Sequence, residues 1–410
     1  MSNPTPRAPL KPLDEALAEL LAHALPLSPA ESVSTFDADG RVLAQDLTAS
    51  LDVPAHDNSA MDGYAVRCAD WLDSATVFEV NQRIAAGSSG DRLGVGCAAR
   101  IFTGAPVPAG ADAIAMQEDC VLVGTQLCLP TQPKPGQWIR RRGEDVLSGV
   151  SVLLKGELLA PESIGLAASI GYEKCLVAPR VRVALFSTGD ELVMPGDVAP
   201  ADMRPGAVYN SNRFFLRALL QRLGCVVSDM GIVPDKLDAT IAALKTASAT
   251  HDLVLTSGGV SVGEEDHIKP AVQALGQLNL WQIAIKPGKP LAYGKIAGAH
   301  VIGLPGNPVS SFVTFLLLVR PFILKLQGAS HVAPDSIAAC AHFDWPRADK
   351  RREFLRVRRN ASGGLDLFNN QSSGVLTSAV WADGLVDNPP GKTIARGDSV
   401  QFIPMSSLMS

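Results

Sequence analysis

The sequence is poor in the cysteine patterns that build disulfide frameworks or metal centres. Seven cysteines occur among 410 residues, each standing alone, with no C-x-x-C pair and no histidine pair at metal-ligand spacing beside them. We interpret them as small buried side chains in a reducing compartment.

Signals for secretion and membrane insertion are also missing. Residues 1–12 are polar and proline-rich and lack the apolar core of a signal peptide. The longest apolar run, residues 312–319, ends at Arg320, far short of the ~20 residues that a membrane span needs. We therefore expect a soluble, cytoplasmic protein that does not bind a membrane.

Charge and aromatic side chains are scarce as well. Charged residues make up 19% of the chain, aromatic residues 5%, and the formal net charge is -5. Such a chain has no overall attraction for nucleic acid or acidic membranes, so local basic groups must hold any anionic ligand. The hydrophobic content of 47% is typical of a folded protein. The length predicts about two to four domains.

Strands and helices alternate from about residue 181 to residue 328. Apolar runs at 181–186, 225–233, 252–256 and 301–304 are typical of buried strands, and amphipathic segments separate most of them. Asn210 or Ser211 can cap the first of these helices, and Asn307 with Pro308 begins the last one. This rhythm predicts a doubly wound α/β domain with a mostly parallel sheet and helices on both faces.

The flanking regions have a different texture. Short β-like runs cut by glycine and proline fill residues 46–149 and again follow residue 328. We predict a discontinuous, elongated helix/strand N-terminal domain (1–45 and 150–180), an inserted β-rich domain (46–149), the α/β domain (181–328) and a C-terminal β-barrel-like domain (329–410). A leucine stripe between residues 10 and 25 indicates one amphipathic helix, which could pack on a dimer partner or on a neighbouring domain.

Three loops of the α/β domain follow predicted strands and are rich in Gly, Ser or Thr, namely 187–192, 257–266 and 304–308. In open α/β sheets ligands bind beyond the carboxyl ends of the strands, where backbone amides and hydroxyls can approach phosphate. Each loop alone could be an ordinary turn, but the three together favour a phosphate site. Gly258 and Gly263 have P-loop spacing, yet Glu264 stands where the lysine is required, which disfavours an ATP-binding P-loop.

Acidic residues share these loops and predict a cation. They are Asp190, Glu191, Asp235, Glu264, Glu265 and Asp266. Several carboxylates beside a phosphate repel one another unless a divalent cation such as Mg²⁺ lies between them. Plainer interpretations stay open: Asp190 as a turn or cap residue, Glu264 and Glu265 as helix-start residues, and Asp266 as a helix cap.

Two basic segments could bind an anion. Lys286 and Lys289 lie in a stiff, proline-flanked loop, and residues 351–359 form a predicted strand that carries Arg356. A solvated loop and a nucleic-acid strip are the alternatives. Because the chain is acidic and only Phe354 offers an aromatic platform beside the arginines, we favour a small anion over nucleic acid.

Seven motifs stand in order along the chain: 58–65 (NSAMDGYA), 102–106 (FTGAP), 142–145 (RGED), 187–192 (STGDEL), 257–263 (SGGVSVG), 285–290 (IKPGKP) and 303–308 (GLPGNP). Together they closely resemble the MoeA family, the molybdopterin molybdenumtransferases related to the gephyrin E domain. The resemblance extends over essentially the whole chain. It implies insertion of molybdate into adenylylated molybdopterin, with Mg²⁺-dependent cleavage of the adenylate and release of AMP.

The resemblance also implies roles for individual residues. The implied catalytic residues are Asp62, Thr103, Asp145, Glu191, Asp235 and Asp266. The implied substrate-binding residues are Ser187, Thr188, Gly189, Ser257, Gly258, Gly259, Ser261, Lys286, Lys289, Pro305, Gly306, Asn307, Pro308, Arg356 and Ser373. The implied Mg²⁺ ligands are Asp190, Glu191 and Asp266.

A homodimer is implied in addition, with a cleft shared between domains and completed by the second subunit. The implied upstream partner is the molybdopterin adenylyltransferase that supplies the pterin nucleotide. That sibling enzyme is an alternative interpretation of the α/β domain, but the roughly 180 residues before the domain argue against it. A receptor-clustering scaffold would need a fused partner domain. The segment 194–208 is longer than the minimal family loop.

Overall fold

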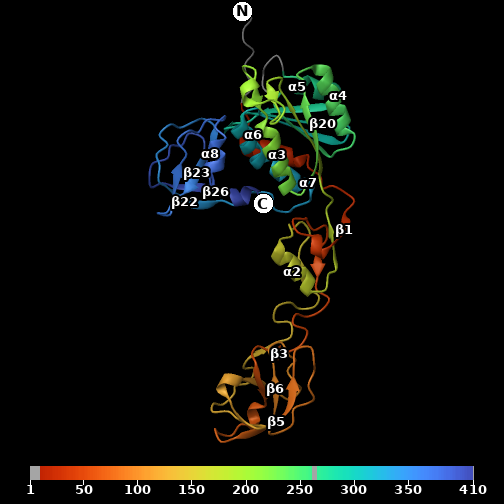
Figure 1. The fold of residues 1–410 in the computed structure, drawn as a ribbon, viewed down its shortest axis with the longest axis vertical. Helices are drawn as coiled ribbons and strands as arrows, with labels where there is room; N and C mark the ends of the chain where they lie inside the picture. Colours follow the sequence, from red (N-terminus) through yellow and green to blue (C-terminus); the bar gives the residue numbers. More distant parts are fainter. Residues whose placement is uncertain (1–9, 261–265, 410) are drawn as a thin grey trace, which may run out of the picture.

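The computed structural model describes residues 10–260 and 266–409. Figure 1 shows an elongated molecule, with the α/β domain and the C-terminal β domain at one end and a small β unit at the other. A slender unit connects the two ends. Because the chain leads out to the small β unit and returns, the connecting unit is built from two separate parts of the sequence.

The central sheet has the doubly wound arrangement that the alternating pattern predicted. Its order is β16 (Val226–Val233), β13 (Arg182–Thr188), β17 (Leu253–Ser257), β21 (Ala299–Leu304), β20 (Pro290–Ile296), β18 (Gln277–Gln282). The first four strands run parallel, whereas β20 and β18 are joined antiparallel to them. The carboxyl ends of four strands therefore meet at one edge of the sheet.

Helices cover both faces of this sheet. On one face, α4 (Leu237–Ser248) and α5 (Ile268–Leu275) pack on alternate strand residues such as Ala184 and Phe186. On the other face, α3 (Ser211–Arg222) and the helix that begins at Pro308 pack on Val183 and Leu185. Asn210 caps α3, as expected, by accepting a hydrogen bond of 3.2 Å from the Arg213 N–H.

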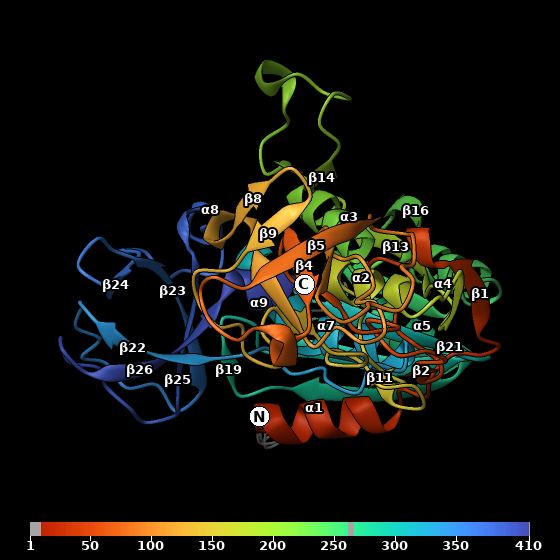
Figure 2. The same cartoon turned by 90° about the horizontal axis from the view of Figure 1, so that it is seen from below.

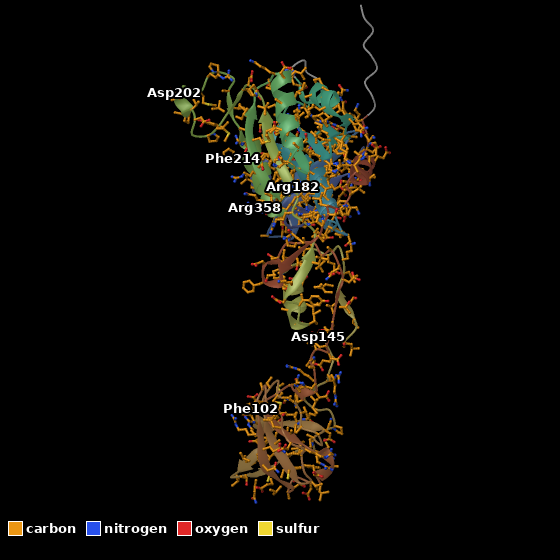
Figure 3. The ribbon with its side chains drawn as sticks, turned by 90° about the vertical axis from the view of Figure 1, so that its right-hand side faces the viewer. Phe102, Asp145, Arg182, Asp202, Phe214 and Arg358 are labelled. Carbon is orange, nitrogen blue, oxygen red and sulfur yellow. The ribbon has the colours of Figure 1, made fainter. Side chains whose placement is uncertain are left out.

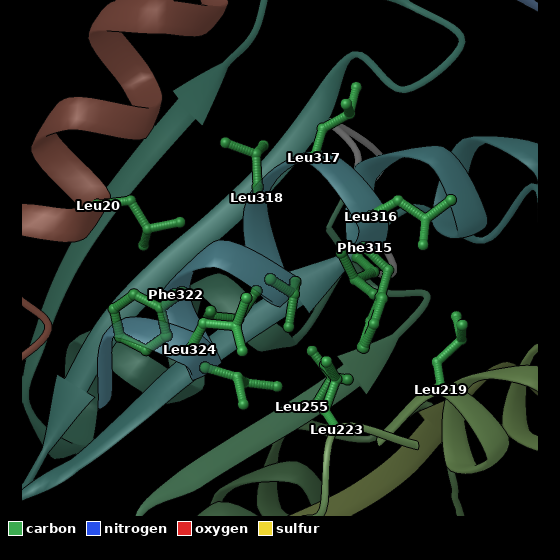
Figure 4. Packing of buried hydrophobic residues seen from close by; sticks show 14 of the residues in the cluster. Leu20, Leu219, Leu223, Leu255, Phe315, Leu316, Leu317, Leu318, Phe322 and Leu324 are labelled. Atoms are coloured by element: carbon green, nitrogen blue, oxygen red, sulfur yellow. The ribbon is translucent and has the colours of Figure 1, made fainter. Parts of the chain in front are cut away.

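The helix that begins at Pro308 is longer than the sequence suggested. It runs through α6 (Pro308–Thr314), the π-helical turn η5 (Phe315–Val319) and α7 (Arg320–Leu326). By length and composition alone, this 19-residue helix could cross a membrane, which corrects the expectation that the apolar run ends too early. However, 94% of its apolar window is buried inside the protein, as in a core helix. Figure 4 shows Phe315, Leu318 and Phe322 packed among residues of the sheet and of α3.

The N-terminal helix α1 (Leu13–Ala22) packs on the α/β domain, although its sequence position had assigned it to the elongated N-terminal domain. Leu13, Ala16 and Leu20 are buried in the same core as α7, and Leu20 faces this core in Figure 4. The Lys11 N–H also donates to the Gln282 carbonyl at 2.7 Å. The leucine stripe thus covers a neighbouring domain within the chain.

Between α1 and the sheet lies a buried histidine. His300 is 6% exposed, and its Nδ1 lies 2.9 Å from the Tyr293 hydroxyl. The His23 ring stacks on Tyr293 at a centroid distance of 5.0 Å, and the Phe322 ring meets His300 edge to face at 4.9 Å. Burial, reinforced by the charges of Lys295 and His23, lowers the pKa of His300 to about 4.

The connecting unit has its own small core. Strands β1 (Glu31–Ser34) and β12 (Lys174–Val177) pair antiparallel, as do β2 (Leu47–Thr48) and β11 (Ser151–Leu153), with α2 (Pro161–Ser169) packed beside them. The distal unit is one sheet of six strands. Its order is β7 (Ala113–Met116), β4 (Gly63–Val66), β6 (Cys97–Ile101), β5 (Val77–Ile84), β9 (Gln126–Cys128), β8 (Val121–Val123).

The C-terminal domain is a closed barrel, as the sequence predicted. Five strands pair in a ring: β23 (Arg352–Arg359), β24 (Gly364–Leu367), β22 (Ile337–Ala341), β26 (Ser399–Pro404), β25 (Gly384–Asn388). The short strand β19 (Ile285–Lys286) leaves the α/β domain and pairs with β23 of the barrel. Helices α8 (Thr377–Trp381) and α9 (Met405–Met409) complete the domain.

We predict that His300 makes the stability of the α/β domain depend on pH. Because its folded pKa is depressed, its contribution is present above the unfolded value near 6.5 and is lost as pH falls toward 4. At about 1.4 kcal/mol per pKa unit, the loss between pH 7 and pH 5 is about 2 kcal/mol. Urea unfolding at the two pH values should show a smaller difference for His300→Gln than for the unchanged protein. Equal differences would contradict the prediction.

Candidate functional site

Two adjoining cavities lie at the edge where the parallel strands end. The larger, about 570 Å³, is lined by Thr188, Glu191, Leu192, Val208, Tyr209, Asn210, Ser211, Asn212, Ser257, Gly258, Gly306, Asn307, Pro308 and Gly374. The smaller, about 340 Å³, is lined by Thr188, Gly189, Glu191, Asp235, Gly258, Gly259, Val260, Asp266, Pro290, Pro305 and Gly306. Thr188, Glu191, Gly258 and Gly306 border both, so the cavities form one cleft.

Most residues that the sequence assigned to the α/β domain lie together in this cleft. The three predicted loops all contribute to its walls, and Ser187 is buried directly behind Thr188 at the end of β13. Ser261, together with Glu264 and Glu265, lies outside the described residues. The expected convergence of loops therefore occurs because β13, β17 and β21 are parallel neighbours.

Two glycines allow the second loop to touch the first. Gly258 and Gly259 have φ values of +95° and +67°. A Cβ on Gly258 would lie 2.5 Å from the Thr188 carbonyl oxygen, and one on Gly259 would lie 2.8 Å from the Thr188 Oγ1. Any larger residue would push the two loops apart, so the narrow floor of the cleft requires glycine at both positions.

Asn212, which sequence reasoning missed, connects three elements of the cleft. Its Nδ2 donates to the Ser257 Oγ at 2.8 Å and to the Gly306 carbonyl at 2.7 Å. The side chain comes from the first turn of α3 and so joins this helix to the loops after β17 and β21. Its position two residues after the helix cap was the available signal. The segment around Asn212 was interpreted only as a helix cap, and Val208, Tyr209 and Gly374 were also missed as lining residues.

Buried polar atoms without a partner are concentrated around the cleft. Among residues 10–260 and 266–409 they include Ser187 Oγ, Thr188 Oγ1, Asn210 Nδ2, Asn212 Oδ1 and Thr256 Oγ1. A buried polar group that makes no hydrogen bond costs about 1–3 kcal/mol. Several such groups at one edge of a sheet fit a polar ligand that supplies the missing donors and acceptors.

Asp190 and Asp235 connect the loops after β13 and β16. The Asp190 N–H donates to Asp235 Oδ2 at 3.1 Å, and the Asp235 N–H donates to Asp190 Oδ1 at 3.2 Å. Burial raises the pKa of Asp235, and the negative charges of Asp190 and Glu191 raise it further. Asp190 therefore orders the turn between the two loops, as the interpretation as a turn residue suggested. The same contact places the Asp190 and Asp235 carboxylates side by side.

Within the described part of the chain, no three His, Cys, Asp or Glu side chains are grouped closely enough to hold a metal ion on their own. Asp266 lines the smaller cavity with Asp235 and precedes α5, whose N-cap position is occupied by His267. The protein thus offers carboxylate oxygens around the cleft. Mg²⁺ commonly takes its remaining ligands from substrate phosphate and water.

The two lysines of the 285–290 loop are in different states. The Lys286 ammonium is 2.9 Å from Glu353 Oε1 and 3.4 Å from Asp349 Oδ2, in an ion-pair cluster with the barrel. Lys289 is half-buried beside Pro290, and its ammonium makes no hydrogen bond or ion pair with the residues that the structure describes. Lys289 is therefore available to an anion, whereas Lys286 is already neutralised.

Arg356 does not reach the wall of either cavity. It is 1% exposed, its Nη1 donates to the Phe354 carbonyl at 2.9 Å, and its Nε donates to Ser378 Oγ at 3.2 Å. Burial lowers the pKa of Arg356 to about 10. Period-two alternation had placed Arg356 and Arg358 on one face, but α8 covers Arg356 while Arg358 is exposed.

Ser373 lies closer to the cleft than Arg356 does. Its carbonyl accepts a hydrogen bond of 2.9 Å from the Val309 N–H, and its neighbour Gly374 lines the larger cavity.

Asp62, Thr103 and Asp145 lie in the other half of the molecule. Asp62 Oδ1 accepts hydrogen bonds of 2.8 Å from both the N–H and the hydroxyl of Thr103, which lower the pKa of Asp62. Figure 3 shows Phe102, the neighbour of Thr103, and Asp145 far from Asp202, which belongs to the α/β domain. Within one chain these residues therefore do not reach the cleft of the α/β domain, and the completion of that cleft by a second subunit stays a prediction. The slender connecting unit keeps the two ends apart.

The long segment 194–208 forms an arm beside the cleft. Strands β14 (Leu192–Val193) and β15 (Val208–Tyr209) pair at its base, and the arm projects from the body in Figure 2. The Tyr209 hydroxyl donates to the Val198 carbonyl at 2.8 Å, and the Arg204 guanidinium donates to the Asp190 carbonyl.

Comparison with known families covers most of the chain. Residues 11–171 match the family model of the MoeA N-terminal region (domain I and II), residues 184–325 match the probable molybdopterin binding domain, and residues 338–405 match the MoeA C-terminal region (domain IV).

Individual proteins agree with these family matches. A molybdopterin molybdenumtransferase of Haemophilus influenzae is 42% identical over 347 residues, covering 84% of this chain and 85% of the relative. Molybdopterin molybdenumtransferase 2 of Mycobacterium tuberculosis is 34% identical over 405 residues, covering 94% and 96%. A crystal structure of a molybdopterin biosynthesis moeA protein from Pyrococcus horikoshii OT3 superposes with a TM-score of 0.84 at 28% identity, covering 97% of this chain and 100% of that one.

We predict that Gly258→Ala destabilises the α/β domain more than Gly231→Ala does. Both glycines have positive φ, but a Cβ at Gly231 meets no atom within 4 Å, whereas one at Gly258 clashes with the Thr188 backbone. The left-handed conformation costs alanine about 1–2 kcal/mol at either site, and the clash adds roughly 1–3 kcal/mol at Gly258 alone. Urea midpoints measure the difference, and equal losses would show that the loop contact can relax.

Proposed function

Because the chain belongs to the MoeA family, we propose that its cleft inserts molybdate into adenylylated molybdopterin and releases AMP, the reaction of a molybdopterin molybdenumtransferase in molybdenum cofactor biosynthesis. The observation that carries this proposal is the convergence of three Gly/Ser/Thr loops on one cleft that also presents unpartnered buried polar atoms and carboxylates. A cavity of about 570 Å³ is in the usual range for a small-molecule site of several hundred Å³.

Phosphate binding follows from the loops. The backbone amides after β17 and β21 and the side chains of Thr188 and Ser257 surround the floor of the cleft, with Ser187 buried behind them. Thr188 Oγ1 makes no hydrogen bond with the described residues and can donate to a phosphate oxygen. Pro305, Gly306, Asn307 and Pro308 place the N-terminus of α6 at the same cleft, where the helix dipole favours an anion.

The carboxylates fit Mg²⁺ in their chemistry. We propose Asp190, Glu191 and Asp266 as its holders, with Asp235 beside them. The repulsion that raises the pKa of Asp235 is relieved by a cation. When bound, Mg²⁺ would neutralise the phosphates and polarise the phosphoanhydride. The remaining ligands would come from substrate and water.

The molybdate dianion requires positive charge, and Lys289 supplies it from the loop beside Pro290. Lys286, Arg356 and Ser373 stay proposed contributors. In Arg356 the Nη2 is buried without a partner among the described residues, so a shift of α8 would expose a donor. We assign no side chain as a covalent nucleophile: molybdate or water attacks the phosphoanhydride phosphorus, its P–O bond breaks and AMP leaves. The protein acts by positioning and charge stabilisation.

We propose a cytoplasmic homodimer in which a second copy brings Asp62, Thr103 and Asp145 to the cleft. Hydrogen bonds hold Asp62 and Thr103 together in the distal β unit, before any second copy binds. The same chain holds these residues far from its own cleft, so another subunit must supply them. The proposed upstream donor is the molybdopterin adenylyltransferase that makes the pterin nucleotide.

Incubation of the protein with adenylylated molybdopterin and Mg²⁺, followed by molybdate, tests the proposed reaction. We expect AMP release to begin only when molybdate is added, because the dianion is the acceptor in the reaction. Chromatography of AMP over time measures it, with sulfate in place of molybdate as the control. AMP release that is independent of molybdate would contradict the proposed insertion of molybdate.

Mixing two inactive variants tests the shared site. Asp62→Asn and Asp266→Asn should each be inactive alone. A mixed dimer combines the unchanged Asp62 of one subunit with the unchanged Asp266 of the other and so contains one intact site. We expect activity to reappear after the variants are denatured together and refolded, but not after each is refolded alone and then assayed. If the mixture stays inactive although mixed dimers form, the two residues do not serve one site in trans.

A further inference from the structure

A strand of the α/β domain is built into the barrel. The parallel pairing of β19 and β23 sets Ile285 opposite Arg352 and Lys286 opposite Glu353. The barrel therefore holds the beginning of the 285–290 loop through backbone contacts. The same loop carries both lysines that the sequence associated with anion binding.

Glu353 is the centre of a buried polar cluster at this junction. Its side chain is 1% exposed, and Oε1 accepts from the Lys286 ammonium at 2.9 Å. Oε2 accepts from the Trp345 indole N–H at 2.7 Å and from the Asn388 amide at 3.4 Å. Each oxygen of the carboxylate thus has a donor from a different segment.

Asp349 balances the remaining charge of the cluster. Its Oδ2 lies 3.4 Å from the Lys286 ammonium and 2.8 Å from Arg351 Nη2. The hydrogen bonds from Arg351 and the nearby Lys286 charge hold the pKa of Asp349 well below its usual range. Two cations face two anions, so the charge of Lys286 is balanced within the cluster. The Glu353 carboxylate is buried, whereas the Lys286 side chain is 37% exposed. Such a partly exposed ion pair adds little stability, but it fixes where its partners lie.

The other side of the loop is held by α6 and by the backbone. Gly288 has a φ of +112°, and a Cβ there would lie 2.4 Å from the Thr314 Oγ1. The Lys289 carbonyl accepts a hydrogen bond of 2.8 Å from the Ile283 N–H. The loop is therefore fixed at Lys286 by the barrel and at Gly288 by the helix, and the half-buried Lys289 ammonium is left without a partner among the described residues.

We propose that Glu353 is a positioning residue for the anionic substrate: by holding the Lys286 ammonium it sets the 286–289 turn and thereby places Lys289 at the cleft. The inference rests on the proposed function, since molybdate is the anion concerned. It gives Lys286 a mechanical role between two domains. In the opposite role, Glu353 would keep Lys286 from binding molybdate directly. Removing the charge of Glu353 would then lower the KM for molybdate.

Glu353→Gln distinguishes the two roles by the direction in which the KM for molybdate changes, because it removes the charge and retains the size of the side chain. Misplacing a binding group by about 1 Å costs up to ~100-fold in rate, so a loosened turn is expected to raise the KM for molybdate roughly tenfold. At saturating molybdate kcat should change little, because the lost interaction contributes to binding and not specifically to the transition state. A KM that is unchanged or lower would overturn the proposal.

Two further variants separate positioning from general damage. Asp349→Asn removes the more distant carboxylate and should also raise the KM, but by less. It serves as the test if Glu353→Gln does not fold. Asp387→Asn is the matched control. Asp387 lies on β25 and accepts from Arg352 Nε at 2.7 Å, next to Glu353 on β23, and it does not contact Lys286. An increase in KM with Asp387→Asn equal to that with Glu353→Gln would show loosening of the barrel in general and would overturn the specific role.

A measurement without turnover distinguishes this inference from the proposed function. Acetic anhydride labelling followed by mass spectrometry reports how available each ammonium is. In the unchanged protein Lys289 should label faster than Lys286, and Glu353→Gln should raise the labelling of Lys286 selectively. Unchanged labelling of Lys286 would overturn the ion-pair contact even if AMP release proceeds. Selective labelling together with AMP release that ignores molybdate would leave the contact standing and remove the proposed reaction.

Discussion

The parallel alignment of β13, β16, β17 and β21 is the constraint on which the site depends. Parallel strands end at the same edge of a sheet, so the loops that follow them are brought together without any attraction between the loops themselves. Their close approach requires glycine at Gly258 and Gly259, because a side chain at either position would collide with Thr188. Asn212 then ties two of these loops to α3. The floor of the cleft is a consequence of sheet topology, refined by two glycines and by the two hydrogen bonds of Asn212.

Polar and acidic groups whose burial is unfavourable without a ligand lie at the same edge of the sheet. Buried hydroxyls and amides remain without hydrogen-bond partners in the described chain. Burial raises the pKa of Asp235, and the negative charges of Asp190 and Glu191 raise it further. A folded core of buried strands and the apolar helix 308–326 supports these groups from behind. A phosphorylated ligand with a divalent cation would satisfy both the hydrogen bonds and the charges. The local cost in the free protein is therefore consistent with binding energy that is released when substrate enters.

The elongated shape divides the proposed catalytic residues between two ends of the chain. The connecting unit is crossed twice by the chain and has its own core, so the ends are held apart by structure and not by a loose linker. At the other junction, β19 and the Lys286–Glu353 pair join the barrel to the α/β domain through a buried contact. The barrel interface thus lies next to the cleft, whereas the distal end of the chain lies far from it.

Much of this protein was determined by local sequence. The βα rhythm predicted the sheet, Asn210 predicted a helix cap that the structure contains, and the Gly/Ser/Thr loops predicted the edge where the cleft lies, because each depends on neighbours in the chain. Ordered motifs indicated the family, which the comparisons confirmed. Tertiary structure alone decided which groups are available to a ligand. Arg356 is covered by α8, Lys286 is neutralised by Glu353, α1 packs on the α/β domain, and Asp62 lies far from the cleft of its own chain. These outcomes follow from contacts between segments that are distant in sequence, and periodicity and motif spacing carry no information about such contacts.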